Sequence, residues 1–216
     1  MMAYSGLLYL SYGFLMFLVI KILSSDPAKT ITPGYWAPPS LFGINSKTGG
    51  YGIEDALFSF FAGAIAAGLF ELIFALKVSK RTSKTLRKGH ALLMAIVAGA
   101  LFIYFVPVNA IYFFIFLQIF GAAVIVWMRR DLFWHAIVGG TLFAVLYAML
   151  FAIFNSLFPH FIGSYYQLEK TSHLLILGIP LEEYLYALSL GMMWAPIYEY
   201  EFRLKDVKAR LRPRRV

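Results

Sequence analysis

The chain has 216 residues, of which 61% are hydrophobic, 18% aromatic and only 14% charged, whereas charged residues make up about 25% of an ordinary soluble domain. This composition excludes a soluble globular domain, and the lack of cysteine excludes disulfide frameworks, thiolate metal sites, iron–sulfur clusters and cysteine nucleophiles. The formal net charge of +8 fits either nucleic-acid binding or the basic loops of a membrane protein, so the position of the basic residues decides between them.

Six apolar runs are long enough to cross a hydrocarbon core of about 30 Å. The first run follows no positive residue and precedes no small-residue cleavage site, so we expect it to stay as a span rather than to be a cleaved signal peptide. We predict an all-α fold, a polytopic bundle of about six transmembrane helices that forms one integral membrane domain over residues 1–216. The predicted spans are Ser5 to Leu23, Ile53 to Leu76, Ala91 to Val106, Ile111 to Met128, Leu132 to Phe158 and Leu174 to Tyr198.

The basic residues are distributed unevenly among the predicted loops. Of the 19 lysines and arginines, 15 lie in the segments Lys77 to Lys88, Arg129 to Arg130 and Arg203 to Arg215, and the other four fall on the opposite side of a six-span arrangement. The positive-inside rule then predicts a cell-membrane protein with both termini in the cytoplasm. We interpret the basic tail as an anchor for lipid headgroups rather than as a nucleic-acid site.

The second and sixth predicted spans resemble each other at an offset of 128 residues. Eight of the 25 positions from Ile53 to Lys77 are identical to their counterparts, including Glu54 with Glu182 and Glu71 with Glu199. We therefore predict a repeated acidic helix, covering about residues 53–77 and 181–205, whose like ends lie on like sides of the membrane.

Both copies of this helix begin with two acids. A carboxylate at the edge of hydrocarbon costs several kcal/mol unless it is paired, protonated or facing a cavity, so such acids are functional candidates. Acids in a first helical turn are also favoured by the helix dipole alone, but two matched pairs, each followed four residues later by an aromatic side chain on the same face, favour a functional role. The candidate catalytic residues are Glu54, Asp55, Glu182 and Glu183, and the candidate substrate-binding residues are Phe58, Tyr184 and Tyr186.

Other polar residues carry weaker signals. Glu71 and Glu199 lie 17 residues beyond the first acid of each pair, about 25 Å along a helix at about 1.5 Å per residue. Ion pairs with the basic loops are the favoured interpretation, so both are second-rank site candidates.

The four histidines show no ligand spacing and predict no metal site, and nucleotide-binding and serine-hydrolase motifs do not occur. Two long loops rich in aromatics, residues 24–52 and 159–178, are predicted to lie in the membrane interface.

The stretch Gly178-Ile179-Pro180-Leu181-Glu182-Glu183-Tyr184-Leu185-Tyr186 resembles the P-x-E-[ED] motif of the membrane-embedded lycopene cyclase domain, found in bacterial, archaeal and fungal carotenoid cyclases of the heterodimeric or fused type. Gly52-Ile53-Glu54-Asp55 keeps the acids but lacks the proline, and the approach Tyr35-Trp36-Ala37-Pro38 is similar to the family's lead-in. The motif acids of the family fall on Glu54, Asp55, Glu182 and Glu183.

The resemblance implies a small all-helical enzyme, a redox-neutral intramolecular lyase or isomerase that cyclises a linear carotenoid end group by acid–base chemistry without a cofactor. Its implied partners are membrane lipids and a hydrophobic isoprenoid substrate, with no nucleic acid, and the sequence leaves homo-oligomer formation open. Two alternatives stay open at this point. One is an enzyme acting on another prenyl lipid or a prenyl diphosphate, although the expected D-x-x-x-D spacing is missing, and the other is a non-enzymatic carotenoid-binding protein or proton-coupled carrier.

Overall fold

The structure is a computed structural model, and it describes residues 1–24, 26, 29–74, 76–80, 90–106, 108–202 and 204–208. Helices make up most of it, and two pairs of short antiparallel strands, β1 with β4 and β2 with β3, complete it. The all-α prediction is therefore confirmed. The long helices are α1 (Met2–Leu23), α4 (Ile53–Phe74), α5 (His90–Phe105), α6 (Ala110–Met128), α7 (Phe133–Leu157) and α9 (Leu181–Trp194). The shorter elements are α2 (Ile31–Gly34), η2 (Leu41–Gly43), α3 (Ile44–Thr48), β1 (Leu76–Lys80), η3 (Arg130–Leu132), α8 (Phe161–Tyr165), η4 (Leu168–Lys170), β2 (Leu175–Ile176), β3 (Ile179–Pro180), α10 (Ile197–Phe202) and β4 (Leu204–Lys208).

Four helical segments are long and apolar enough to cross a membrane: α1, α4, α6, and η3 together with α7. Each lies within a few residues of a predicted span, and the shorter apolar helix α5 matches a fifth. The sixth predicted span differs, because residues before Leu181 form the β2–β3 hairpin instead of helix. This helix also stops early, since Pro196 has no amide hydrogen to continue the helical bonds, and the chain resumes as α10 at Ile197.

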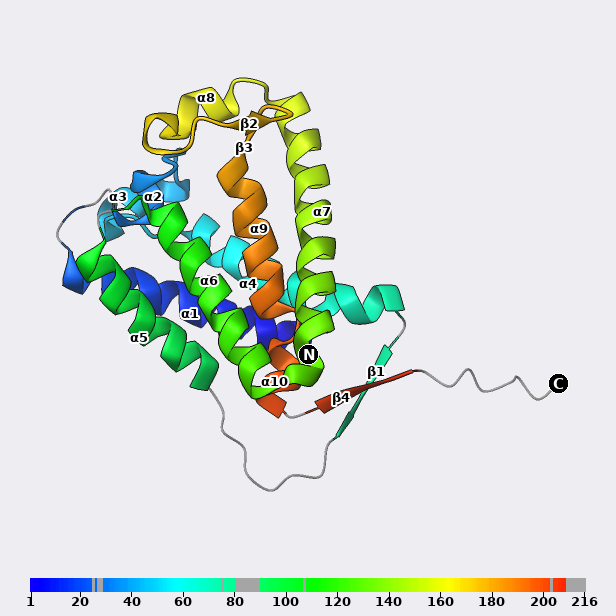
Figure 1. Cartoon of the computed structure of the whole chain (residues 1–216). Helices are drawn as coiled ribbons and strands as arrows, with labels where there is room; N and C mark the ends of the chain where they lie inside the picture. Colours follow the sequence, from blue (N-terminus) through cyan, green and yellow to red (C-terminus); the bar gives the residue numbers. More distant parts are fainter. Residues whose placement is uncertain are drawn as a thin grey trace.

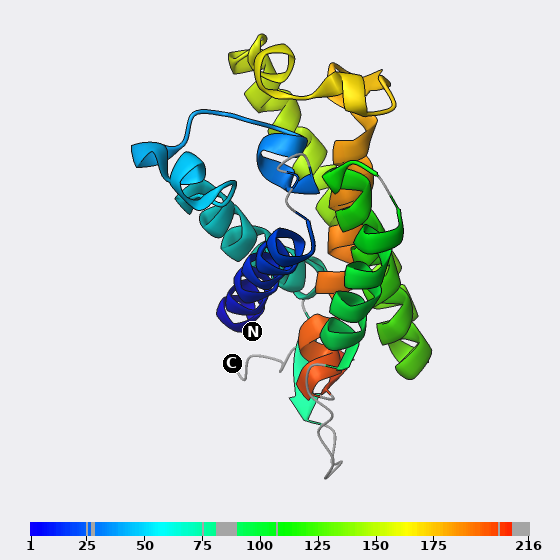
Figure 2. The same ribbon diagram turned by 90° about the vertical axis from the view of Figure 1, so that its left-hand side faces the viewer.

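Helices α1 and α4 lie side by side and cross the steeper helices α6, α7 and α9 (Figure 1). Helix α9 packs between α6 and α7, and the same two groups of helices are seen from the side in Figure 2. The first turns of α4 and α9, which carry the acid pairs, therefore come from different layers of the bundle.

Glycines allow the closest helix contacts. A Cβ atom on Gly63 of α4 would lie 2.5 Å from the Tyr9 Cβ of α1, and one on Gly191 of α9 would lie 2.8 Å from the Cα of Gly140 in α7. Small residues at such crossings let backbones approach, which is the main source of close packing between membrane helices. These two contacts fix α4 against α1 and α9 against α7.

Two loops cover the end of the bundle at which α4 and α9 begin (Figure 1). The loop after α1 and the loop after α7 pair through a β-bridge between Trp36 and Tyr166. The Ala37 N–H donates to the Tyr165 carbonyl, and the Gln167 N–H donates to the Tyr35 carbonyl, both at 2.8 Å. The aromatic loops that the sequence assigns to the interface thus join into one cover.

The outer faces of the helices carry large apolar side chains, as a lipid-facing surface requires. Ile22, Leu72 and Trp127, for example, are 82%, 78% and 73% exposed. The basic segment 81–88 and the tail residues 203 and 209–215 lie outside the described residues, so their role as cytoplasmic anchors, and the cytoplasmic position of both termini, stay predictions.

Candidate functional site

A cavity of about 540 Å³ lies among α1, α4, α6, α7 and α9, beneath the paired loops. Its volume is within the range of about 300–1,000 Å³ that is typical of sites for small organic ligands. Most of its wall is aromatic or aliphatic, and two carboxyl groups, those of Asp55 and Glu183, face into it from different helices. The cavity therefore brings one acid from each predicted pair to a single site.

The cavity also reaches the outer surface of the bundle between α4 and α7. Phe58 and Phe61 of α4 and Leu150 of α7 all line it, yet they are 41%, 56% and 56% exposed. This rim is apolar, so it suits contact with the hydrocarbon of a membrane. A hydrophobic molecule dissolved in the bilayer could reach the two acids without passing through water.

Asp55 is held by the start of its own helix. One carboxylate oxygen accepts a hydrogen bond from the Gly52 N–H at 2.7 Å, and the other lies 3.5 Å from the Thr32 hydroxyl, which donates to it. A side chain at the third helical position that binds the amide of the N-cap residue is the backbone half of a capping box. Part of the hydrogen-bonding capacity of Asp55 is thus used by the helix terminus.

Glu183 occupies the corresponding place in α9, but its environment differs. Its side chain is 4% exposed and accepts a hydrogen bond at 2.6 Å from the Tyr147 hydroxyl of α7. The phenol groups of Tyr35 and Tyr166, from the paired loops, lie close enough to interact with the same carboxyl. Burial and then the nearby Glu183 raise the pKa of both loop tyrosines, so both phenols stay protonated beside the carboxyl.

The difference between the two acids follows from one residue. The N-cap of α9 is Pro180, which has no amide hydrogen, so Glu183 cannot form the backbone bond that Asp55 makes with Gly52. The Glu183 carboxyl is directed instead toward the tyrosines and the cavity. The proline of the motif therefore frees this acid from a capping role.

The first acid of each pair binds a loop. Glu54 accepts a hydrogen bond from the Leu41 N–H at 2.5 Å, and Glu182 accepts one from the Ser172 N–H at 2.7 Å and one from the Tyr112 hydroxyl at 2.5 Å. Neither Glu54 nor Glu182 is among the residues that line the cavity. The four candidate acids thus divide into two that face the cavity and two that anchor the loops covering it.

Of the three candidate substrate-binding residues, two line the cavity and one does not. Phe58 and Tyr186 line the cavity and stack on each other, with ring centroids 6.4 Å apart. The Tyr186 hydroxyl lies 2.7 Å from the Tyr9 hydroxyl, in a polar network that Gln118 extends. Tyr184 points away, because its hydroxyl donates to the Ile176 carbonyl of the β2–β3 hairpin at 2.9 Å.

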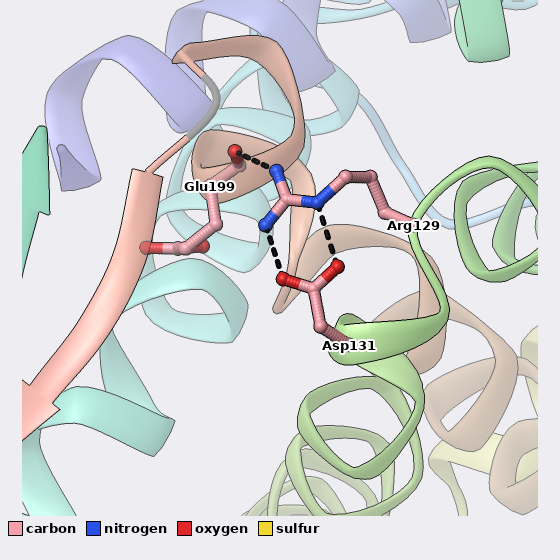
Figure 3. A network of polar contacts seen from close by, with 3 residues as sticks. All are labelled: Arg129, Asp131 and Glu199. Atoms are coloured by element: carbon pink, nitrogen blue, oxygen red, sulfur yellow. Dashed lines mark hydrogen bonds and ion pairs between the residues drawn. The ribbon is translucent and has the colours of Figure 1, made fainter. Parts of the chain in front are cut away.

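The second-rank acids Glu71 and Glu199 meet at the opposite end of the bundle, together with His135. Arg129 approaches this group, but it donates to the main-chain carbonyl of Glu199 at 3.1 Å and pairs with Asp131 (Figure 3). The spacing of histidines along the sequence gave no indication that His135 would join two acids, since its partners are 64 residues away on either side.

The sequence did not indicate the tyrosines around Glu183. Tyr35 belongs to the aromatic lead-in to the first motif, and Tyr166 to an aromatic pair assigned to the interface, so both had another explanation. Tyr147 lies within an apolar span that contains many aromatics. Only the tertiary fold shows that the three phenols surround one carboxyl.

Residues 109–201 match the sequence model of a protein family described as lycopene cyclase. The match contains Glu182, Glu183, Tyr112, Tyr147 and Tyr166, and it confirms the family resemblance inferred from the motif. No curated protein and no solved structure matches the chain.

Proposed function

We propose that the chain is an intramembrane carotenoid cyclase of the lycopene type, in which Glu183 is the general acid and Asp55 the general base. The observation that carries the proposal is the position of these two carboxyls on one aromatic-walled cavity that opens between α4 and α7. The match of residues 109–201 to the lycopene cyclase family supports it.

The proposed reaction starts with proton transfer. Glu183, as the carboxylic acid, donates its proton to the terminal double bond of a linear end group, which forms a C–H bond and leaves a tertiary carbocation. A second double bond of the same chain attacks this cation and closes a six-membered ring. The Asp55 carboxylate then removes a proton from the neighbouring ring carbon to restore a double bond. Substrate and product are isomers, and proton return from Asp55 to Glu183 completes the cycle.

The cavity wall suits a carbocation. The faces of aromatic rings are electron-rich and attract cations, and Phe58, Tyr186 and Phe151 all line the cavity. Water would capture the cation, whereas an apolar site under a closed loop cover excludes it. The tyrosines around Glu183 would stabilise its carboxylate after proton donation, since hydrogen bonds to an ionised oxygen are stronger than those to a neutral one.

A prenyl diphosphate is a less suitable substrate. No lysine or arginine occurs among the described residues that line the cavity, so a diphosphate would need a divalent cation to bridge it to the two carboxyls. A neutral hydrocarbon end group needs no counter-ion. The chemistry of the wall therefore favours an uncharged polyene over the diphosphate alternative.

The direct test is expression of the chain in cells that accumulate lycopene, followed by chromatographic separation of the pigments. We expect new carotenes with one or two cyclic ends and the same mass as lycopene, because the proposed reaction only rearranges bonds. Unchanged lycopene in cells whose membranes contain the folded protein would contradict the proposal and favour a binding role.

Replacing Pro180 by alanine should slow cyclisation by about tenfold. The new N-cap amide can capture the Glu183 carboxyl as Gly52 captures Asp55, and one hydrogen bond of about 1.4 kcal/mol corresponds to a factor of about ten in rate. The measurement is the initial rate of lycopene loss in isolated membranes. Pro159→Ala, at an exposed turn after α7, is the matched control and should leave the rate unchanged; equal rates for Pro180→Ala and wild type would contradict the role given to the proline.

A further inference from the structure

Three side chains with metal-binding atoms meet at the end of the bundle opposite the cavity, where the proposed cyclisation uses none of them. Glu71 comes from α4, His135 from α7 and Glu199 from α10. One ligand atom of each lies within 4.8 Å of the other two. The three residues are 8%, 3% and 0% exposed, so the cluster is enclosed by the protein rather than spread over its surface.

The distances within the cluster suit a bound metal ion. His135 Nε2 lies 3.4 Å from Glu71 Oε1, which is within ion-pair distance. Two ligand atoms that each lie about 2.1 Å from a tetrahedral ion are themselves about 3.4 Å apart. The imidazole plane is fixed by Phe70, whose ring stacks on it with centroids 4.0 Å apart.

The ligand atoms themselves also suit a cation. Carboxylate oxygens and imidazole nitrogens are common ligands of divalent metal ions in proteins. The nearby guanidinium of Arg129 is held by both oxygens of Asp131, at 2.8 and 2.7 Å. Figure 3 shows Arg129 between Asp131 and Glu199, where it donates a hydrogen bond to the main-chain carbonyl of Glu199.

We propose that Glu71, His135 and Glu199 bind one divalent transition-metal ion of the zinc, manganese or iron(II) class. A ligand set of one imidazole nitrogen and two carboxylate oxygens suits these ions better than it suits copper(I), which prefers sulfur, or calcium, which prefers oxygen alone. The ion joins α4, α7 and α10, three helices that come from distant parts of the chain. Its role is structural: it fixes the end of the bundle from which α4 and α7 extend toward the cavity.

The test uses the full chain purified in detergent, stripped with a chelator and then supplied with Zn²⁺, Mn²⁺ or Co²⁺ alone. Elemental analysis should find about one ion per chain, and Co²⁺ should give the visible absorption bands of a nitrogen and oxygen site. The midpoint of thermal unfolding should rise by about 5 °C or more when metal is restored, as expected for a ligand that binds only the folded state.

Glu71→Gln and His135→Gln should each lose the bound ion and the thermal shift. His160→Gln, which changes an exposed histidine at the other end of the molecule, is the matched control and should keep both. Because the Co²⁺ spectrum is read on the wild-type protein, the test does not depend on the stability of the variants. Wild-type protein that takes up no metal and shows no Co²⁺ bands overturns the proposal. Equal metal content in His135→Gln and wild type also overturns it, as the sign of an adventitious ion only.

Discussion

Glu183→Gln is expected to abolish ring formation, with the rate of lycopene cyclisation falling by about a thousandfold. Glutamine has nearly the same shape but cannot donate a carboxylic acid proton, and a positioned general acid contributes about 10²–10⁴ to a rate. The Tyr147 hydroxyl, which donates to Glu183 at 2.6 Å, can donate equally to the glutamine carbonyl, so the variant should fold. The measurement is chromatography of carotenes from lycopene-accumulating cells, with membrane protein levels matched.

The neighbouring acid provides a control for this prediction. Glu182 binds Ser172 and Tyr112 and does not line the cavity, so Glu182→Gln should reduce thermal stability while keeping the rate within about tenfold of wild type, the effect of a hydrogen bond lost in positioning. If Glu182→Gln lost all cyclisation while Glu183→Gln retained it, the general acid would have to be reassigned. Full activity in both variants would exclude acid catalysis by this pair.

The location of the candidate site at the starts of two helices could be predicted from the sequence. Acid pairs within long apolar segments are rare enough to be noticed, and the lycopene cyclase motif at Pro180 to Glu183 pointed to the same place. Most of the spans could also be predicted, because an apolar run of about 20 residues can adopt few structures in a membrane other than a helix. The β2–β3 hairpin was missed, since its short apolar strands read as the start of a span.

The sequence could not predict which acid of each pair binds a loop and which faces the cavity. Glu54 and Asp55 are adjacent, as are Glu182 and Glu183, and nothing in the residue types separates the acid that binds a loop from the acid that faces the cavity. That separation depends on where Leu41 and Ser172 return to the bundle, which is a tertiary property. The sequence shows that Gly52 precedes one helix where Pro180 precedes the other. Only the hydrogen bond from the Gly52 N–H to Asp55 shows that this difference decides whether the acid caps its helix.

Gly191→Val is expected to have the largest effect on stability among these variants, because α9, which carries Glu183 to the cavity, packs directly on α7. A Cβ atom on Gly191 would lie 2.8 Å from the Gly140 Cα and from the Phe143 Cβ, and 3.1 Å from the Gly139 carbonyl oxygen. Two of these three atoms belong to the backbone, which cannot rotate away as a flexible side chain can. The helices would have to separate, at a cost of about 3 kcal/mol, the upper end of the usual range for overpacking.

Separating α7 from α9 would also move Tyr147 away from Glu183, so the variant should lose both folded protein and residual activity. The measurement is the thermal midpoint of the detergent-purified protein, followed by size-exclusion chromatography after heating. Gly163→Val is the matched control, because no atom lies within 4 Å of the Cβ position at Gly163 in α8, and it should keep the wild-type midpoint. A wild-type midpoint in Gly191→Val would mean that α7 and α9 are not in backbone contact, and the shared cavity of Asp55 and Glu183 would then lose its structural basis.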